Sequence, residues 1–181
     1  MKIHPAVFVL VLCVPGAVQT QSRVQAVHDE SSVTYHLTHP LHKIEATSRD
    51  VLFDAMADMT ARKLTGVTAN VDVMTFDSGN SNRDSHAMEV IDALSFPDVR
   101  FTSTAIVQTG DSAYVTGDLT FHGVTKPVVA ALLLQWSNGG LRAVGRMDVS
   151  LQAFAIERPS LLMIPVEDDL RFDIVAVFKT P

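Results

Sequence analysis

A two-residue alternation of apolar and polar side chains, repeated along the chain, is the feature that most constrains its fold. In residues 170–178, apolar side chains occupy every second position, while Arg171 and Asp173 lie between them. Residues 67–73, 113–121 and 141–149 follow the same period. Successive side chains of a strand point to opposite faces, so this pattern indicates strands with one apolar face.

The alternation predicts about eight strands and a further strand segment at 168–178. The eight are placed at residues 32–38, 43–48, 51–57, 64–75, 98–107, 113–121, 127–136 and 141–150. The polar residues 21–31 are predicted to be a loose lead-in, and Asn-Gly-Gly at 138–140 is typical of a hairpin turn. Such an antiparallel all-β chain forms either a sandwich or a barrel, and periodicity does not distinguish the two.

Two glycines, Gly117 and Gly145, lie on the apolar faces of these segments. They are compatible with interior space, with the close approach of a neighbouring backbone, or with a bulge. One short helix is expected before Pro97, with Asn82 as its cap and Asp84 near its positive end. Its apolar stripe is expected at Ala87, Val90, Ile91 and Leu94.

Residues 1–20 have the features of a signal peptide. Lys2 precedes an apolar run at 6–14, which is far shorter than the ~20 residues of a membrane-spanning helix. Cleavage is expected between Ala17 and Ser22, which leaves one domain at 21–181 without an integral membrane segment. The alternative is a buried N-terminal strand.

Charge and cysteine content exclude several classes of function. Cys13 lies in the expected signal peptide, and the large Leu12 before it argues against a lipid-anchored cysteine. The mature domain would then contain no thiol for disulfides, catalysis or metal binding. The whole chain carries 14 basic and 20 acidic residues, a net charge of −6, and no Lys/Arg cluster. Nucleic acid and anionic membrane surfaces are therefore poor partners.

Three segments carry a resemblance to a known family. They are residues 76–86, Phe-Asp-Ser-Gly-Asn-Ser-Asn-Arg-Asp-Ser-His; residues 95–104, Ser-Phe-Pro-Asp-Val-Arg-Phe-Thr-Ser-Thr; and residues 117–127, Gly-Asp-Leu-Thr-Phe-His-Gly-Val-Thr-Lys-Pro. Together they resemble the YceI-like family of small exported proteins. The resemblance implies an antiparallel, lipocalin-like β-barrel. It further implies non-enzymatic binding of an amphipathic long-chain lipid, isoprenoid-like, in the lumen, either in the periplasm or outside the cell.

The resemblance also implies that a set of apolar side chains lines the lumen. Without the resemblance, these side chains would be interpreted as an ordinary hydrophobic core. As a lumen lining they would bury a prenyl or acyl chain at ~0.8 kcal/mol per CH₂. The expected lining is Phe101, Leu119, Phe121, Leu132, Leu134, Met147, Phe172 and Ile174. His42 resembles a family histidine near the barrel mouth, and His86 lies in the segment expected to cover the barrel. Both are therefore candidate ligand-binding residues.

Other polar residues give no strong sign of chemistry. His36, His39 and His42 are three apart, which places neighbours on opposite strand faces and disfavours a shared metal. Asp84 and His86 do not share a helix face. Asp168 and Asp169 are expected at a solvated edge, and no Gly-x-Ser-x-Gly elbow occurs.

No catalytic residue, metal or cofactor is therefore expected. Two alternatives remain for the function. One is an enzyme with an unrecognised site near His42 and His86, and the other is a filled β-sandwich that acts through surface contacts. The stretch 150–162 departs from the family pattern, since Arg158 precedes a proline and no glycine follows. The apolar segment 161–165 is expected to close one end of the barrel.

Overall fold

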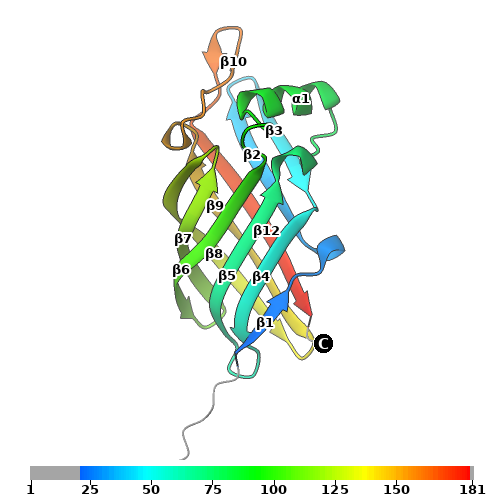
Figure 1. Cartoon of the computed structure of the whole chain (residues 1–181), viewed down its shortest axis with the longest axis vertical. Helices are drawn as coiled ribbons and strands as arrows, with labels where there is room; N and C mark the ends of the chain where they lie inside the picture. Colours follow the sequence, from blue (N-terminus) through cyan, green and yellow to red (C-terminus); the bar gives the residue numbers. More distant parts are fainter. Residues whose placement is uncertain (1–20, 180–181) are drawn as a thin grey trace, which may run out of the picture.

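A curled antiparallel sheet forms the body of the molecule (Figure 1). The computed structural model describes residues 21–179, so the expected signal peptide lies outside the described residues. Within that range ten strands form the sheet: β1 (Ser22–Gln25), β2 (Ser32–His39), β3 (His42–Ser48), β4 (Val51–Asp58), β5 (Lys63–Asp72), β6 (Asp98–Thr109), β7 (Ser112–Phe121), β8 (Val124–Ser137), β9 (Gly140–Ser150) and β12 (Asp169–Lys179).

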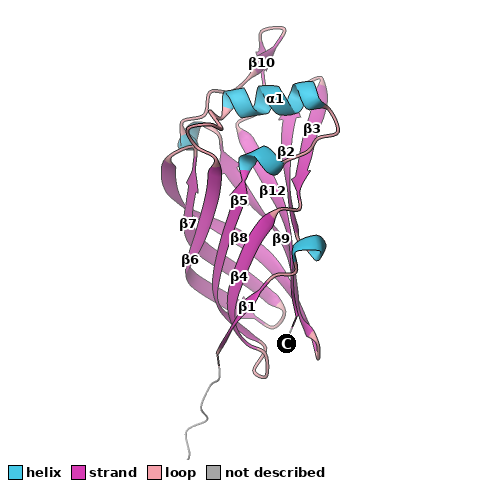
Figure 2. Ribbon diagram, turned by 45° about the vertical axis from the view of Figure 1, so that its right-hand side comes forward, coloured by secondary structure: helices cyan, strands magenta, loops and turns pink. Residues whose placement is uncertain are grey.

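The strand order is β1-β4-β5-β6-β7-β8-β9-β12-β2-β3, and every pairing is antiparallel. Both edges of the curled sheet find backbone partners. Beyond β1, Ala26 pairs with Phe178 of β12. On the β3 edge, the N–H groups of Thr47 and Asp77 each donate to the other's carbonyl, at 3.0 and 3.1 Å. These contacts draw the sheet into a barrel-like cylinder (Figure 2), and the predicted lipocalin-like all-β fold is confirmed.

The predicted strands correspond to β2 to β9 and β12, with shifted ends. The segment expected at 64–75 ends as a strand at Asp72, whose carboxylate accepts the Met74 N–H (2.8 Å) and starts the 3-10 helix η2 (Val73–Thr75). The prediction missed β1, because only Val24 of its four residues is buried and the segment shows no apolar alternation. The 3-10 helices η1 (His28–Glu30) and η3 (Gln152–Phe154) complete the connections.

Gly117 and Gly145 mark close packing rather than interior space. A Cβ on Gly117 would lie 2.4 Å from the ring of Phe101, and one on Gly145 would lie 2.0 Å from the carbonyl oxygen of Ala131. The ring of Phe101 on β6 thus fills the space that a side chain at Gly117 on the neighbouring strand β7 would need. The register of β6 against β7 also shifts between Ser103 and Ala105, beside Gly117, as in a bulge.

Helix α1 (Ser81–Val90) lies across one end of the barrel (Figures 1 and 2). Its cap is Asn80, whose side-chain oxygen accepts the N–H groups of Asn82 and Arg83 at 3.1 and 3.2 Å. The expectation that Asn82 caps the helix is therefore wrong. Asp84 accepts the Ser78 N–H instead (3.2 Å), which secures the turn before the helix. Leu94 is also wrongly placed in the apolar stripe, since 89% of its surface is exposed.

The ends of α1 are fixed to the barrel by the segments that carry the family resemblance. Ahead of the helix, the ring of Phe76 packs on Tyr35 with centroids 5.3 Å apart. After the helix, the ring of Phe96 lies 4.8 Å from that of His122. It also lies against Gly123, where any Cβ would be 2.5 Å from it. Local sequence therefore positions the helix over the barrel end.

Candidate ligand-binding site

The interior of the barrel contains a cavity of about 90 Å³, which we call the inner cavity. Its lining consists entirely of apolar side chains from eight strands. Six of the predicted lumen residues contribute to it: Phe101, Leu119, Leu132, Met147, Phe172 and Ile174. An apolar cavity with no polar partner for water is suited to a hydrocarbon.

A second cavity of about 130 Å³, the outer cavity, lies between the barrel end and α1. Strand residues such as Tyr35, Phe121 and Leu170 form its apolar side. The helix contributes apolar side chains such as Met88 and Val90, together with the polar and charged Arg83, Asp84 and His86. The outer cavity is therefore mostly apolar with a few charged groups in its lining, whereas the inner cavity has none.

The two cavities follow one another along the barrel, because Val99 and Phe172 line both. On β12, Leu170 lines the outer cavity, and Ile174 and Phe178 line the inner one. Leu170 and Phe178 are eight residue steps apart along β12, a distance of roughly 27 Å. Val99 and Phe172 thus lie at the boundary between two neighbouring cavities, of which the outer one has the charged side chains.

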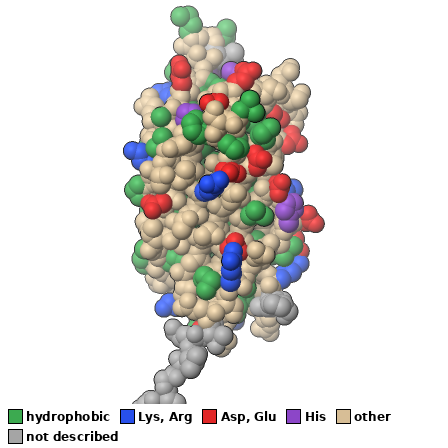
Figure 3. Space-filling model, in the orientation of Figure 1, with side chains coloured by type: hydrophobic (Ala, Val, Ile, Leu, Met, Phe, Trp, Pro, Cys, Tyr) green, Lys and Arg blue, Asp and Glu red, His purple; other side chains and the backbone are tan. Residues whose placement is uncertain are grey.

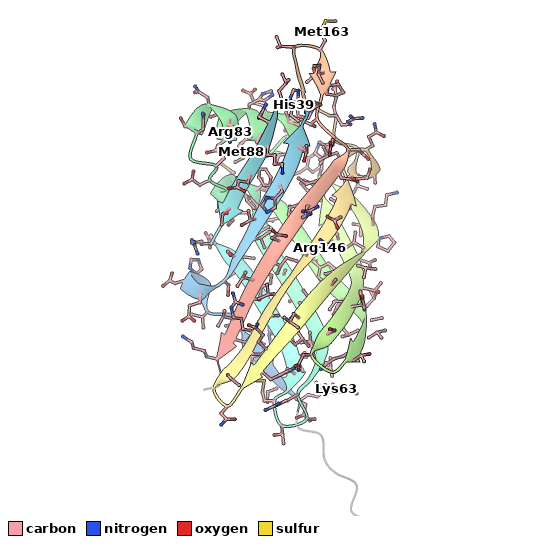
Figure 4. The ribbon with its side chains drawn as sticks, turned by 180° about the vertical axis from the view of Figure 1, so that it is seen from behind. His39, Lys63, Arg83, Met88, Arg146 and Met163 are labelled. Carbon is pink, nitrogen blue, oxygen red and sulfur yellow. The ribbon has the colours of Figure 1, made fainter. Side chains whose placement is uncertain are left out.

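Two predicted ligand-binding residues line neither cavity. Leu134 is fully buried in the core. His42 is exposed at the start of β3, where its ring lies 5.0 Å from that of His39. By contrast, Phe121 and His86 line the outer cavity, as do Arg83 and Met88. Figure 4 labels Arg83 and Met88 on the helix at this end of the barrel.

Sequence reasoning missed Tyr35 and Met88, which also line the outer cavity. Tyr35 could have been found, because Val33, Tyr35 and Leu37 alternate with polar residues in β2. Burial raises the pKa of Tyr35, and the neighbouring Asp84 carboxylate raises it further, against the opposing effect of Arg83. The phenol therefore stays neutral and can serve a ligand as a hydrogen-bond donor.

Arg83 is half-buried at this polar end. Among the described residues, no carboxylate lies within ion-pair distance of its guanidinium. Its neighbour His86 is exposed and lies 3.8 Å from Glu89. The mouth of the lumen thus places the Arg83 guanidinium, the Asp84 carboxylate and the neutral Tyr35 hydroxyl beside an apolar wall.

The remaining polar candidates have structural roles. His39 is buried, with Nε2 2.9 Å from the Ile164 carbonyl and Nδ1 accepting the Leu41 N–H. Asp168 is not merely solvated, because it accepts hydrogen bonds from the Ser150 hydroxyl and Gln152 N–H, which lower its pKa. In the part of the chain that the structure describes, no group of three His, Cys, Asp or Glu side chains could hold a metal ion. That part also contains no helix of the length and apolarity needed to cross a membrane.

Comparison with known proteins identifies a matching family and relatives of similar sequence. Residues 20–178 match the family model of the YceI-like domain. A UPF0312 protein of Pseudomonas savastanoi pv. phaseolicola is 32% identical over 141 residues, which cover 72% of each chain. A UPF0312 protein of Pseudomonas fluorescens is 38% identical over 114 residues, which cover 57% of this chain and 59% of the relative.

Two solved structures share the fold. Burkholderia cenocepacia BcnA superimposes with a TM-score of 0.76 at 20% identity, covering 84% of this chain and 98% of BcnA. A polyisoprenoid binding domain from Saccharophagus degradans, implicated in plant cell wall breakdown, superimposes with a TM-score of 0.67 at 11% identity. That alignment covers 90% of this chain and all of the other. At these identities the likeness concerns the fold alone.

Proposed function

The chain belongs to the YceI-like family, and we propose that it binds an amphipathic long-chain lipid non-covalently in its lumen. The observation that carries the proposal is an all-apolar inner cavity next to an outer cavity whose mostly apolar lining includes Arg83, Asp84 and His86. The polyisoprenoid binding domain among the structural neighbours supports an isoprenoid-like ligand.

The driving force is burial of hydrocarbon. Each methylene that leaves water contributes about 0.8 kcal/mol, so a chain that fills both cavities gains affinity with its length. Continuous occupancy requires the side chains of Val99 and Phe172 to move aside, because they stand between the cavities. The apolar tail then lies in the inner cavity.

The head group lies in the outer cavity, beside Tyr35, Arg83 and His86. Arg83 suits a phosphate or carboxylate, and the neutral Tyr35 suits a hydroxyl or carbonyl oxygen. Binding requires no covalent step. The function is accordingly non-enzymatic, and no cofactor takes part.

We place this function outside the cytoplasm, in the periplasm or beyond the cell. The basis is the sequence of residues 1–20, with its short apolar run. Domain 21–181 would then be the mature protein. The intact mass of the chain purified from its source tests this, and a mass that includes residues 1–20 contradicts it.

Substitution of Met147 by tryptophan tests the lumen. Met147 lines the inner cavity, so the larger ring should occupy space that the lipid uses. Displacing about two methylenes costs about 1.6 kcal/mol, more than tenfold in affinity. We expect Met147→Trp to lose most of the lipid that organic extraction releases from wild type, with little change in the unfolding midpoint.

The matched control is Met56→Trp, because Met56 lies on the exposed face of β4. It should keep the wild-type lipid content. Unchanged lipid in a stable Met147→Trp variant would remove Met147 from the ligand site. A lipid-free wild type together with a variant destabilised by ~1–3 kcal/mol would instead indicate a filled interior and contradict the proposal.

A further inference from the structure

A short hairpin projects from the end of the barrel that holds α1 and the outer cavity (Figure 1). It consists of β10 (Ser160–Leu161) and β11 (Ile164–Pro165), and we call residues 160–165 the apolar hairpin. Its tip is formed by Leu162 and Met163, which are 77% and 95% exposed. Met163 lies at the far tip of the hairpin (Figure 4), and hydrophobic side chains are exposed at this tip in the space-filling view (Figure 3). The expectation that this segment closes the barrel is therefore wrong.

The backbone of this tip favours other residue types. Leu162 and Met163 have φ values of 51° and 68°, in the left-handed region. A two-residue turn with both φ values positive favours Asn-Gly, because large side chains are strained there. Here two large apolar side chains occupy those positions and extend into solvent. Neither local conformation nor burial accounts for them.

The hairpin is fixed to the barrel at its base. Arg158 donates from Nε to the Val166 carbonyl at 2.7 Å, and the Val166 N–H donates to the Pro159 carbonyl at 3.0 Å. The ring of His39 bonds to the Ile164 carbonyl. Because Pro159 also lines the outer cavity, the hairpin rises directly from the rim of the lumen.

A second exposed apolar side chain belongs to the same assembly. Leu41, in the turn between β2 and β3, is 60% exposed, and its N–H donates to His39 Nδ1. His39 therefore holds this turn and the apolar hairpin together through its two ring nitrogens. Residues 40–41 and 160–165 contain no charged side chain, in a chain with a net charge of −6.

We propose that the apolar hairpin and Leu41 dock onto an uncharged lipid bilayer, with Leu162 and Met163 inserted into its interface. A few side chains on a narrow projection are too small for a stable protein interface, which buries about 800 Å² on each partner. They suffice for shallow insertion, whose strength follows the apolar area buried. Docking in this position brings the rim of the outer cavity to the membrane surface. The docking itself does not depend on lipid binding in the lumen.

Two tryptophan reporters test the site of contact. Met163→Trp places an indole at the tip, and Leu52→Trp is the matched control, because Leu52 is 63% exposed on the wall of the barrel. Each is mixed with vesicles of phosphatidylcholine that carries brominated acyl chains. We expect the added emission of Met163→Trp to be quenched and shifted to the blue, and that of Leu52→Trp to be unchanged. Equal responses of the two variants would overturn the proposal.

Charged substitutions at the tip test how strongly the apolar hairpin contributes to vesicle binding. The double variant Leu162→Asp with Met163→Asp should lower partitioning onto phosphatidylcholine vesicles, measured by flotation, by at least about tenfold. Leu52→Asp should leave it unchanged. Wild type that does not float with the vesicles would overturn the proposal. The tip would instead be a protein contact if wild type binds no vesicles but forms a dimer in analytical ultracentrifugation, and the two Asp substitutions abolish that dimer.

The lipid content of the same preparations separates this inference from the lumen function. A tip variant that no longer floats but retains extractable lipid supports docking as a distinct property. Wild type that floats yet contains no lipid after exposure to the vesicles also supports docking, and counts against the lumen function alone.

Discussion

Asn80 determines where α1 begins. Its backbone is extended, with φ −143° and ψ 104°, and its side chain serves two N–H groups of the first turn. The sequence offers Asn80, Ser81 and Asn82 in succession, all suitable caps. Gly79, with φ 73°, sets the turn that brings Asn80 into position. That backbone geometry cannot be read from residue types, so the sequence alone does not distinguish Asn80 from Asn82 as the cap.

We expect Asn80→Ala to lower the free energy of unfolding by about 1 kcal/mol, the usual cost of a lost helix cap. Asn82→Ala is the control, because only its backbone N–H takes part in the cap. Thermal or urea unfolding of both variants measures the difference. Equal destabilisation by the two changes would show that the side chain of Asn80 contributes nothing specific.

The sequence predicts the lumen residues only as a set of side chains that face inward, and does not show which of them line a cavity. Alternation along a strand shows which side chains share a face, and Phe101, Leu119 and Met147 indeed line the inner cavity. Leu134 shares that pattern yet packs fully against its neighbours. Whether an inward-facing side chain lines a cavity or packs in the core depends on the side chains of other strands that face it. The sequence of a single strand does not show which side chains those are. Whether these residues hold a ligand is the prediction that the Met147→Trp experiment addresses.

At the scale of elements, prediction succeeded where one apolar face lies against the interior. Strands β2 to β9 and β12 all have this character. The stretch between β9 and β12 does not, and its course was not predictable. There the chain turns through η3, whose first residue, Gln152, donates its N–H to the Asp168 carboxylate sixteen positions later in the chain. The apolar residues that follow project outward because this turn and the Arg158 contact direct them away from the lumen.

The Asp168 contact predicts a pH dependence of stability. Hydrogen bonds from Ser150 and Gln152 lower the pKa of Asp168 in the folded state relative to the unfolded chain. Its ionised form therefore stabilises the fold above the ordinary aspartate range, and this contribution is lost as the pH falls through the lowered value. From about pH 4 downward, the unfolding midpoint of wild type should fall more steeply than that of Asp168→Asn.

Asp169→Asn is the matched control for this titration, since Asp169 is the exposed neighbour at the start of β12. Its midpoint should follow wild type across the same range. Parallel curves for wild type and Asp168→Asn would mean that the Asp168 hydrogen bonds do not persist in solution.

For the whole molecule, periodicity led only to a choice between sandwich and barrel, and the family resemblance favoured the barrel. The two contacts that draw the sheet edges in, Ala26 with Phe178 and Thr47 with Asp77, join residues far apart in the chain. They are backbone pairings, so no pattern of side chains in the sequence predicts them. The same holds for the in-line arrangement of the cavities, which depends on the curvature of the sheet and on the position of α1.

The central claim is that the lumen holds one amphipathic long-chain lipid, and native mass spectrometry of the protein purified from its source tests it most directly. We predict one non-covalent adduct per chain, which organic extraction releases as a molecule with a long apolar chain and a polar head. A chain that carries no adduct when isolated gently, and takes up none from mixed lipids, would contradict the account.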